Sequence, residues 1–537
     1  MNCYYRQGKE REKRDIWRRI CYNDRVIAIR AAYRPAPQRG NHNTRMKKGE
    51  EKMDYKIKGF QPEKLFHFFE DICAIPRGSG NEKGISDFLV NFAKERGLWV
   101  YQDDSCNVII KKAGSKGAED KPAVMLQGHI DMVCDKRAGV EHDFEKDGID
   151  LVLKDGVLSA NGTTLGADNG VAVALMMMVL DDEELKHPPV ECVFTTEEEI
   201  GLNGAQALDK SQISARTMIN MDSEEEGVAT VSCAGGLRME LTREISREEV
   251  SGSLLQVKIE GLLGGHSGTD ISKERQNANL LMARMVSRLM TETDGKLVTF
   301  AGGTKDNAIT RECEASLIYA DAAEAEKAEQ IACALAEKMA EEITPYEEDF
   351  SCEISVEDNR TVQAVPDTDA KAFIGAIRLA PNGVYRRNMK MDGFVVVSSN
   401  MGVVRADEDK LVIVISPRSS VASLQEDTKE RFMLLGETFG FAVNCSGEYP
   451  GWSYAEESKV REVFAESYRE LFGEELKMEA IHAGLECGLF SDAIPGLDAI
   501  AVGPTLYNVH TPDENVPLDS FERFYKLLKD VLARLAA

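Results

Sequence analysis

Helical and strand-like patterns alternate in the first part of the chain. Amphipathic helices are predicted at 62–77 and 84–97, where apolar residues recur every three or four positions. Residues 170–180 are apolar throughout, which predicts a buried helix. Short apolar strands are predicted at 122–133, 190–196 and 216–222. This alternation between about residues 85 and 235 indicates an α/β fold with a mixed sheet flanked by helices.

The pattern changes between about residues 236 and 445, where strands are more frequent. Strands are predicted at 254–262, 297–303 and 312–320, with helices at 277–290 and 325–343. A similar order follows, with strands at 395–404, 410–418 and 441–446 and a helix at 429–440. We therefore expect an α+β domain built from two related halves. A helix at 457–473 and a strand at 497–504 then resemble the first region, so this domain is inserted into the first one.

We expect the first domain to consist of residues 53–235 and 446–537, with the inserted domain at 236–445. Residues 1–52 form a basic extension with 15 Lys/Arg against 6 Asp/Glu and no clear hydrophobic period. A nucleic-acid-binding arm or a transit peptide would share this composition. We favour a disordered extension, or upstream sequence translated ahead of a natural start at Met53.

Charge and cysteine usage narrow the functional classes. The 537 residues include 65 basic and 91 acidic ones, and the formal charge of −26 argues against nucleic acid or membrane as a partner. The longest apolar run, 171–180, is too short to span a bilayer. The twelve cysteines form no CxxC pair and no secretory signal precedes them, so we expect reduced thiols and a cytoplasmic protein.

Candidate chemistry begins in a buried strand that carries His129 and Asp131 two positions apart. Residues i and i+2 share one face of a strand, so the carboxylate can hold one ring nitrogen while the other binds a metal. A histidine and an aspartate in this arrangement, without other evidence of a site, more often form an ordinary hydrogen bond. Asp168 lies between Gly166 and Gly170 just ahead of the buried helix, where it serves as a helix cap or as a metal ligand.

Further acidic residues and a histidine follow other apolar strands. Glu198 and Glu199 come after one strand, Asp222 ends the next, and His510 follows a strand near the C-terminus. Each has an ordinary explanation, such as a solvated helix start or a loop histidine. Strand ends of an α/β sheet gather at one edge, however, and together these residues would suit two divalent metals that share one carboxylate. The mixed ligands favour Zn²⁺, with Mn²⁺ or Co²⁺ as alternatives.

Seven motifs in this order resemble those of M20 metallopeptidases, and specifically the aminoacyl-histidine dipeptidase branch. They are GHIDMVCDK (128–136), TTLGADNGV (163–171), EEIGLNGA (198–205), NMDSEEEG (220–227), GGHSGTDI (264–271), IHAGLECGLF (481–490) and HTPDE (510–514). The resemblance covers about residues 53–537. It implies a zinc-peptidase-type catalytic domain, with the inserted domain as a lid.

The resemblance also implies a set of metal ligands. Asp168 would bridge the two metals. His129 and Asp222 would complete one site, and Glu199 and His510 would complete the other. The peptide bond after Asp168 is expected to be cis.

Three further residues are implied in catalysis. Asp131 would orient the ring of His129. Glu198 would be the general base for the attacking water. His266, between glycines in the inserted domain, would donate a hydrogen bond to the developing oxyanion.

The resemblance implies a dipeptide substrate of the Xaa-His type, including β-alanyl-histidine. Arg418 would bind its C-terminal carboxylate, since a guanidinium matches a carboxylate. Asn307 and Glu486 would line the site, and Glu486 could pair a free amine. All three positions would also suit residues without a role in binding.

Other functions stay open at this point. Another amide hydrolase of the same fold, such as a tripeptidase or an N-acyl-amino-acid deacylase, is one alternative. A metal-free binding protein is another, although it would be expected to lack a ligand or the base, and all of these positions are filled. The oligomeric state is also open: a doubled lid could complete the site within one chain, and a homodimer is the alternative.

Overall fold

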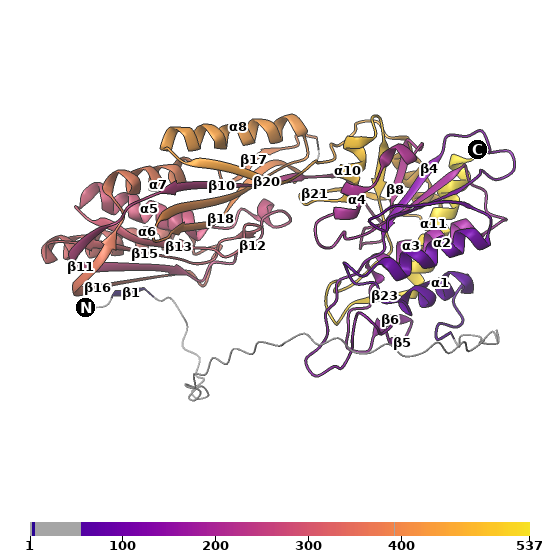
Figure 1. The fold of residues 1–537 in the computed structure, drawn as a ribbon, viewed down its shortest axis with the longest axis horizontal. Helices are drawn as coiled ribbons and strands as arrows, with labels where there is room; N and C mark the ends of the chain where they lie inside the picture. The colour runs from indigo at the N-terminus through magenta and orange to yellow at the C-terminus, as the bar shows by residue number, and fades with distance from the viewer. Residues whose placement is uncertain (1–2, 6–54, 391–392) are drawn as a thin grey trace, which may run out of the picture.

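Two large sheets dominate the computed structural model, which describes residues 3–5, 55–390 and 393–537 (Figure 1). An eight-stranded sheet lies at one end of the molecule and a ten-stranded sheet at the other. The chain enters the ten-stranded sheet at Gly235 and leaves it after Tyr449. We keep residues 236–445 as the proposed extent of the inserted domain.

The eight-stranded sheet is mixed, and its centre is parallel. In spatial order its strands are β2 (Trp99–Gln102), β3 (Val108–Lys112), β7 (Val190–Thr195), β4 (Val124–His129), β8 (Thr217–Asn220), β22 (Asp498–Ala501), β9 (Val228–Cys233) and β21 (Lys477–Ile481). The neighbours β7, β4, β8 and β22 run parallel, so their carboxyl ends reach the same edge. That edge is where ligands bind in α/β sheets.

Helices cover both faces of this sheet because its central strands are apolar on both sides. Val108 and Ile110 of β3 enter one core, whereas Ile109 enters the other. The larger core is closed by α1 (Glu63–Cys73), α2 (Lys83–Glu95), α3 (Ala167–Asp181), α9 (Lys459–Phe472) and α11 (Leu518–Leu535). The smaller core is closed by the short helices α4 (Asn203–Ala207) and α10 (Glu486–Ala493). A small sheet of β5 (Leu151–Lys154), β6 (Val157–Ala160) and β23 (Asn515–Pro517) completes this part.

The ten-stranded sheet carries its helices on one side, where they share a single core (Figure 1). The main strands are β10 (Gly235–Glu244), β11 (Glu248–Glu260), β13 (Lys296–Gly302), β15 (Cys313–Tyr319), β16 (Ser351–Ala364), β18 (Val395–Ala406), β19 (Lys410–Ser419) and β20 (Ala442–Tyr449), and β17 (Gly383–Arg387) pairs with β18. The helices are α5 (Ala278–Glu292), α6 (Ala322–Ile343), α7 (Asp367–Leu379) and α8 (Ala422–Phe439). Two short strands, β12 (Gly265–His266) and β14 (Ala308–Ile309), pair beside this sheet.

The two related halves predicted for this sheet are present, and one is nested in the other. The first half has the order β11-α5-β13-β15-α6-β16, and the second has β10-α7-β18-β19-α8-β20. Their strands mirror each other across the sheet, as β16-β11-β15-β13 and β18-β19-β10-β20. The halves meet where β13 pairs with β18 at Ala301↔Arg405 and Gly302↔Val404. The sequence did not reveal that β10 belongs to the second half, because the whole first half follows it in the chain.

One part of the N-terminal extension differs from the expectation. Residues Cys3–Tyr5 form β1, which pairs with Cys352–Ile354 at the outer edge of β16. An edge strand presents unpaired backbone groups that recruit such a segment, and tyrosine favours strands. The other predictions for residues 1–52 concern positions outside the described residues.

The described residues also bear on the predictions about membrane spans and disulfides. No helix within 55–390 or 393–537 is long and apolar enough to cross a bilayer. Cysteines such as Cys73, Cys192 and Cys487 are buried thiols outside any disulfide.

Candidate active site

The predicted metal ligands converge at the carboxyl edge of the eight-stranded sheet. His129 is the last residue of β4, Glu199 follows β7, and Asp222 follows β8. Asp168 lies in the first turn of α3, and His510 lies in the loop between β22 and β23. We call these five residues the metal cluster.

Asp168 lies at the centre of the metal cluster. Its Oδ1 is 3.0 Å from His129 Nε2, and its Oδ2 is 3.1 Å from His510 Nε2. His129 Nε2 is also 3.5 Å from Asp222 Oδ1, and His510 Nε2 is 3.0 Å from Glu199 Oε2. Two groups of three possible ligands therefore share Asp168, one with His129 and Asp222 and the other with Glu199 and His510.

The atoms of the metal cluster suit divalent cations. The side chains of Asp168, Asp222 and Glu199 are only 13%, 10% and 7% exposed. Glu199 Oε1 is buried without a hydrogen-bond partner among the described residues. Three nearby buried carboxylates repel one another unless positive charge lies between them. Carboxylates together with imidazoles are a donor set that fits zinc and similar metals.

Protons and metal ions compete for the metal cluster. Hydrogen bonds to Asp168 and Glu199 raise the pKa of His510 to about 11. Burial opposes the charging of His129, but Asp222, Asp131 and Asp168 raise its pKa well above the usual range. A ring nitrogen must lose its proton to bind a metal, so metal binding here is expected to release protons.

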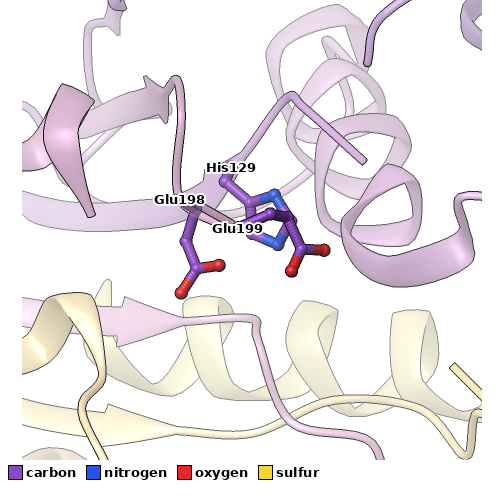
Figure 2. Close-up of side chains that lie close together, drawn as sticks. All are labelled: His129, Glu198 and Glu199. Carbon is purple, nitrogen blue, oxygen red and sulfur yellow. The ribbon is translucent and has the colours of Figure 1, made fainter. Parts of the chain in front are cut away.

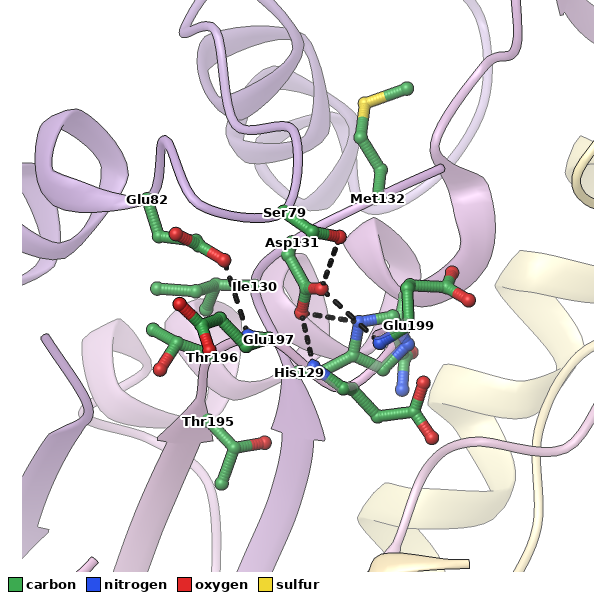
Figure 3. A network of polar contacts seen from close by, with 12 residues as sticks. Ser79, Glu82, His129, Ile130, Asp131, Met132, Thr195, Thr196, Glu197 and Glu199 are labelled. Carbon is green, nitrogen blue, oxygen red and sulfur yellow. Dashed lines mark hydrogen bonds and ion pairs between the residues drawn. The ribbon is translucent and has the colours of Figure 1, made fainter. Parts of the chain in front are cut away.

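Asp131 fixes two parts of the site at once (Figure 3). Its Oδ1 is 3.2 Å from His129 Nδ1, the ring nitrogen that faces away from Asp168. It also accepts hydrogen bonds from the backbone N–H groups of Glu198 (3.2 Å) and Glu199 (3.3 Å) and from Ser79 Oγ (2.8 Å). The predicted pairing with His129 is present, although β4 ends at His129 and Asp131 lies just beyond it.

Glu198 and Glu199 lie on either side of the His129 ring (Figure 2). Burial, together with Asp222, Glu486 and Glu199, raises the pKa of Glu198 to about 9. Glu198 also lines a pocket of about 430 Å³. The other lining residues are Gly201, Leu202, Asn203, Gln206, Gly447, Glu448, Tyr449 and Gly484. The base candidate thus borders a space that both sheets help to form.

Three of the predicted substrate residues lie on or beside the ten-stranded sheet: His266 and Arg418 are on strands, and Asn307 is in the turn before β14. His266 ends β12, and the backbone carbonyl of Asn307 accepts the N–H of Ser267 at 2.9 Å. Arg418 lies on β19 and donates from Nη1 to the Tyr449 hydroxyl at 2.9 Å. Burial and the charge of Arg418 lower the pKa of His266, so its imidazole is neutral near pH 7. We call His266, Asn307 and Arg418 the substrate cluster.

Glu486, the fourth predicted substrate residue, is more deeply buried than the other three. Its side chain has no exposed surface, and it accepts hydrogen bonds from Gln127 and from Thr195 Oγ1 (2.8 Å) behind the strand ends. Burial raises its pKa to about 7. Its Oε1 has no hydrogen-bond partner among the described residues, and the contact with a free amine stays a prediction.

Two residues inside the quoted motifs were not predicted to support the site. Asn169 donates from Nδ2 to Asp222 Oδ1 at 2.7 Å, and the Asp168–Asn169 peptide bond is cis, as expected. His482 Nε2 is 2.7 Å from Ser398 Oγ of β18, so the segment 481–490 contacts the ten-stranded sheet. Their position inside the quoted motifs was the only sequence signal for either residue.

Comparison with known proteins places this arrangement in a family. The profile of Peptidase family M20/M25/M40 matches residues 125–534. The cytosol non-specific dipeptidase of Escherichia coli (strain K12) is 35% identical over 479 residues, which are 89% of this chain and 98% of that protein. The crystal structure of aminoacylhistidine dipeptidase from Vibrio alginolyticus matches with a TM-score of 0.84 at 35% identity, over 88% of this chain and 97% of that one.

A more distant solved structure shows how far the fold extends. The aminopeptidase PepT of Bacillus cereus matches 89% of this chain with a TM-score of 0.51 at 16% identity, which shows a shared fold only. The matched segment 125–534, by contrast, includes every residue of the metal cluster. The matches with the two closer proteins cover 89% and 88% of this chain. The chain therefore belongs to peptidase family M20/M25/M40 and is a peptide-bond hydrolase.

Proposed function

We propose that the protein is a dipeptidase with two metal ions that hydrolyses Xaa-His dipeptides, including β-alanyl-histidine. The observation that carries the proposal is the position of Asp168, whose two oxygens face His129 and His510 separately. Such a carboxylate suits a bridge between two divalent cations, with Zn²⁺ as the first candidate and Mn²⁺ or Co²⁺ as alternatives. The 35% identity to a Vibrio protein named aminoacylhistidine dipeptidase supports the Xaa-His class.

Glu198 is the proposed general base. Cations bound in the metal cluster would supply Lewis acidity, which polarises a peptide carbonyl and acidifies water. Positive charge in the cluster also lowers the pKa of Glu198, because it favours the ionised carboxylate. Glu198 would then take a proton from the attacking water and pass it to the leaving nitrogen.

His266 is the proposed donor to the oxyanion. Its Nδ1 accepts the backbone N–H groups of Gly268 (3.3 Å) and Thr269 (3.2 Å). The proton of the neutral ring therefore lies on Nε2, which leaves an N–H group for an oxygen that becomes negative during the reaction.

Arg418 is the proposed binder of the C-terminal carboxylate. It is 9% exposed, and its Nε has no partner among the described residues. An arginine with an unused donor in a buried setting is suited to a carboxylate ligand. One carboxylate held at this point, with cleavage at the metal cluster, would favour short peptides.

We also propose a cytoplasmic location. The free thiols of the described residues and the 35% identity to an Escherichia coli protein named cytosol non-specific dipeptidase support it.

The test is release of histidine from β-alanyl-histidine by zinc-loaded protein. Glu198→Gln removes the base while keeping its shape, and we expect it to lower kcat by ~10²–10⁴-fold with bound zinc retained. Glu197→Gln is the matched control, because Glu197 is the adjacent carboxylate and belongs to none of the possible ligand groups. Its activity should stay near that of the parent.

Two results would contradict the proposal. A parent protein that binds two zinc ions but releases no histidine would overturn the Xaa-His assignment. A fully active Glu198→Gln variant would overturn the role of Glu198 as base.

A broader dipeptidase is the second candidate, because the Escherichia coli relative is named non-specific. A panel of dipeptides with and without C-terminal histidine would separate the two candidates. Including a tripeptide and an N-acyl amino acid would test the remaining hydrolase alternatives. Equal kcat/KM across the dipeptides would favour the non-specific enzyme.

A further inference from the structure

Glu514 binds the backbone of the segment that carries Asp168. Its Oε2 accepts the N–H groups of Leu165 (2.8 Å) and Gly166 (2.9 Å). Its Oε1 accepts those of Ala167 (2.7 Å) and Asp168 (3.2 Å). Four consecutive N–H groups at the start of α3 thus point at one carboxylate, which is 2% exposed.

The bonds of Glu514 join two loops that are far apart in sequence. Glu514 follows His510 by four residues in the loop before β23. Within the described residues, the donors to Glu514 are these four backbone N–H groups. A buried carboxylate is costly without hydrogen-bond donors. These bonds therefore constrain where Glu514 lies relative to residues 165–168. The loop of His510 is therefore tied directly to the loop of Asp168.

Arg77 binds the same segment from the opposite side. Its Nη1 donates to the carbonyl oxygens of Ile130 and Asp131, each at 3.0 Å, just after the end of β4. Its Nη2 donates to the carbonyl oxygen of Gly166. Arg77 is 2% exposed, so these bonds form in the interior. It thereby ties the segment of His129 and Asp131 to the loop of Asp168.

The two glycines beside Asp168 make room for Arg77. A Cβ at Gly166 would lie 2.5 Å from Arg77 Nη2, and one at Gly170 would lie 2.8 Å from the same atom. Gly166 also has a φ of +69°, which side chains rarely adopt. The guanidinium of Arg77 lies against both glycines, which explains the Gly-x-x-x-Gly spacing around Asp168.

We propose that Arg77 and Glu514 are positioning residues that set the spacing of Asp168 from His129 and His510, and so the affinity of the metal cluster. The inference rests on the proposed di-metal function. Arg77 links the His129 segment to Gly166, and Glu514 links the His510 loop to residues 165–168. Their charges are opposite and they hold opposite sides of one peptide segment, so three ligand-bearing segments are fixed together before a metal binds.

The test measures zinc affinity without any substrate. Glu514→Gln keeps the size of the side chain but replaces one acceptor oxygen with an NH₂ group that faces N–H donors. We expect zinc Kd, from competition with a chromophoric chelator, to rise by ~10–100-fold, as for other residues that support a ligand. At saturating zinc, kcat should fall while KM for the dipeptide stays near that of the parent.

Glu191→Gln is the matched control. Glu191 is a buried carboxylate that accepts the backbone N–H groups of Ser214 (2.9 Å) and Ala215 (3.0 Å). It lies near the start of β7, at the edge of the sheet opposite the metal cluster. We expect this variant to lose thermal stability as Glu514→Gln does, but to keep the zinc affinity of the parent.

A second variant covers the case in which Glu514→Gln fails to fold. Gly170→Ala adds a methyl group against Arg77 Nη2 and removes no charge. Alanine is the better helix former, so a rise in zinc Kd could not come from weaker helix propensity in α3. We expect zinc Kd to rise here as well.

The outcomes separate this inference from the proposed function. Zinc affinity equal to that of the parent in both Glu514→Gln and Gly170→Ala would overturn the positioning role alone. A parent that binds zinc but does not cleave Xaa-His dipeptides would overturn the substrate assignment and leave the inference standing. A parent that binds no zinc would overturn both.

Discussion

The metal cluster and the substrate cluster differ in the kind of buried atom that each leaves unpaired. Glu199 Oε1 of the metal cluster is an acceptor without a hydrogen-bond partner in the described residues. In the metal cluster, both oxygens of Asp168 lie within 3.1 Å of a histidine nitrogen. Beside the substrate cluster, Arg418 Nε and Ser267 Oγ are buried without a partner in the described residues. An unpaired buried group costs ~1–3 kcal/mol, which a ligand can offset. The unpaired acceptor of the metal cluster suits a cation, whereas the unused arginine donor of the substrate cluster suits an anionic group.

The two clusters also differ in the elements that supply their residues. The residues of the metal cluster lie at strand ends and in loops of one sheet, so the order of the strands in that sheet determines which of them are neighbours. The substrate cluster takes His266 and Asn307 from the first half of the ten-stranded sheet and Arg418 from the second. Its geometry therefore depends on how the two halves meet. Mutations should separate an effect on metal from an effect on substrate.

The largest effect is expected for Asp168→Asn. The variant removes the carboxylate that both histidines face, so at least one metal should be lost. We expect kcat/KM to fall by more than the ~10⁴-fold upper range for loss of a general base. Metal content by elemental analysis, alongside kcat/KM, checks this. Two metals bound with activity near that of the parent would show that Asp168 is no bridge.

An intermediate effect is expected for Arg418→Met. Loss of a charged hydrogen bond costs about 1.5–3 kcal/mol, so KM for the dipeptide should rise by ~10–100-fold. Metal content should stay constant, because Arg418 lies outside the metal cluster. Arg405→Met is the control, since Arg405 is an exposed arginine on β18. An unchanged KM would contradict the role of Arg418 in substrate binding. A loss of metal would show that the two clusters do not act separately.

The smallest effect is expected for the change of thermal stability with pH. The folded pKa of His510, about 11, lies above the ordinary value of 6.5. The stabilisation from its bonds is therefore complete below about pH 6.5 and is lost as the pH rises toward 11. We expect the Tm of chelator-treated protein to fall above neutral pH, whereas zinc affinity should rise because protons then compete less.

Thermal scans across pH, with zinc and with chelator, test this sign. His510→Asn should flatten the fall in the chelator series, since the group that titrates is gone. A Tm that rises with pH in the chelator series would contradict the assignment.

Sequence reasoning was most successful where function follows strand ends. His129, Glu199 and Asp222 each come directly after an apolar run, so their edge of the sheet was predictable. The helix at 84–97 was predictable because its apolar spacing is regular, and the helix at 170–180 because it is apolar throughout. The mirror arrangement of the two halves was not, because β10 is separated from α7 by the whole first half.

The residues that support the site were harder to find. Arg77 and Glu514 bind backbone atoms of segments far away in the chain, and no side-chain pattern encodes such partners. The burial of Glu486 was not predictable either. Its motif suggested a substrate contact, but burial depends on the packing of α10 against the sheet, which composition does not reveal.

The nesting of the first half has a consequence for how such a chain could arise. The entry and exit of that half are adjacent, because Glu248 of β11 pairs with Ala364 of β16. A single insertion between β10 and α7 could thus add the half without reordering any other strand. Without that half, only Val404 and Arg405 among the described residues of β18 would lose their strand partners, because β17 already pairs with residues 395–399 on the same edge.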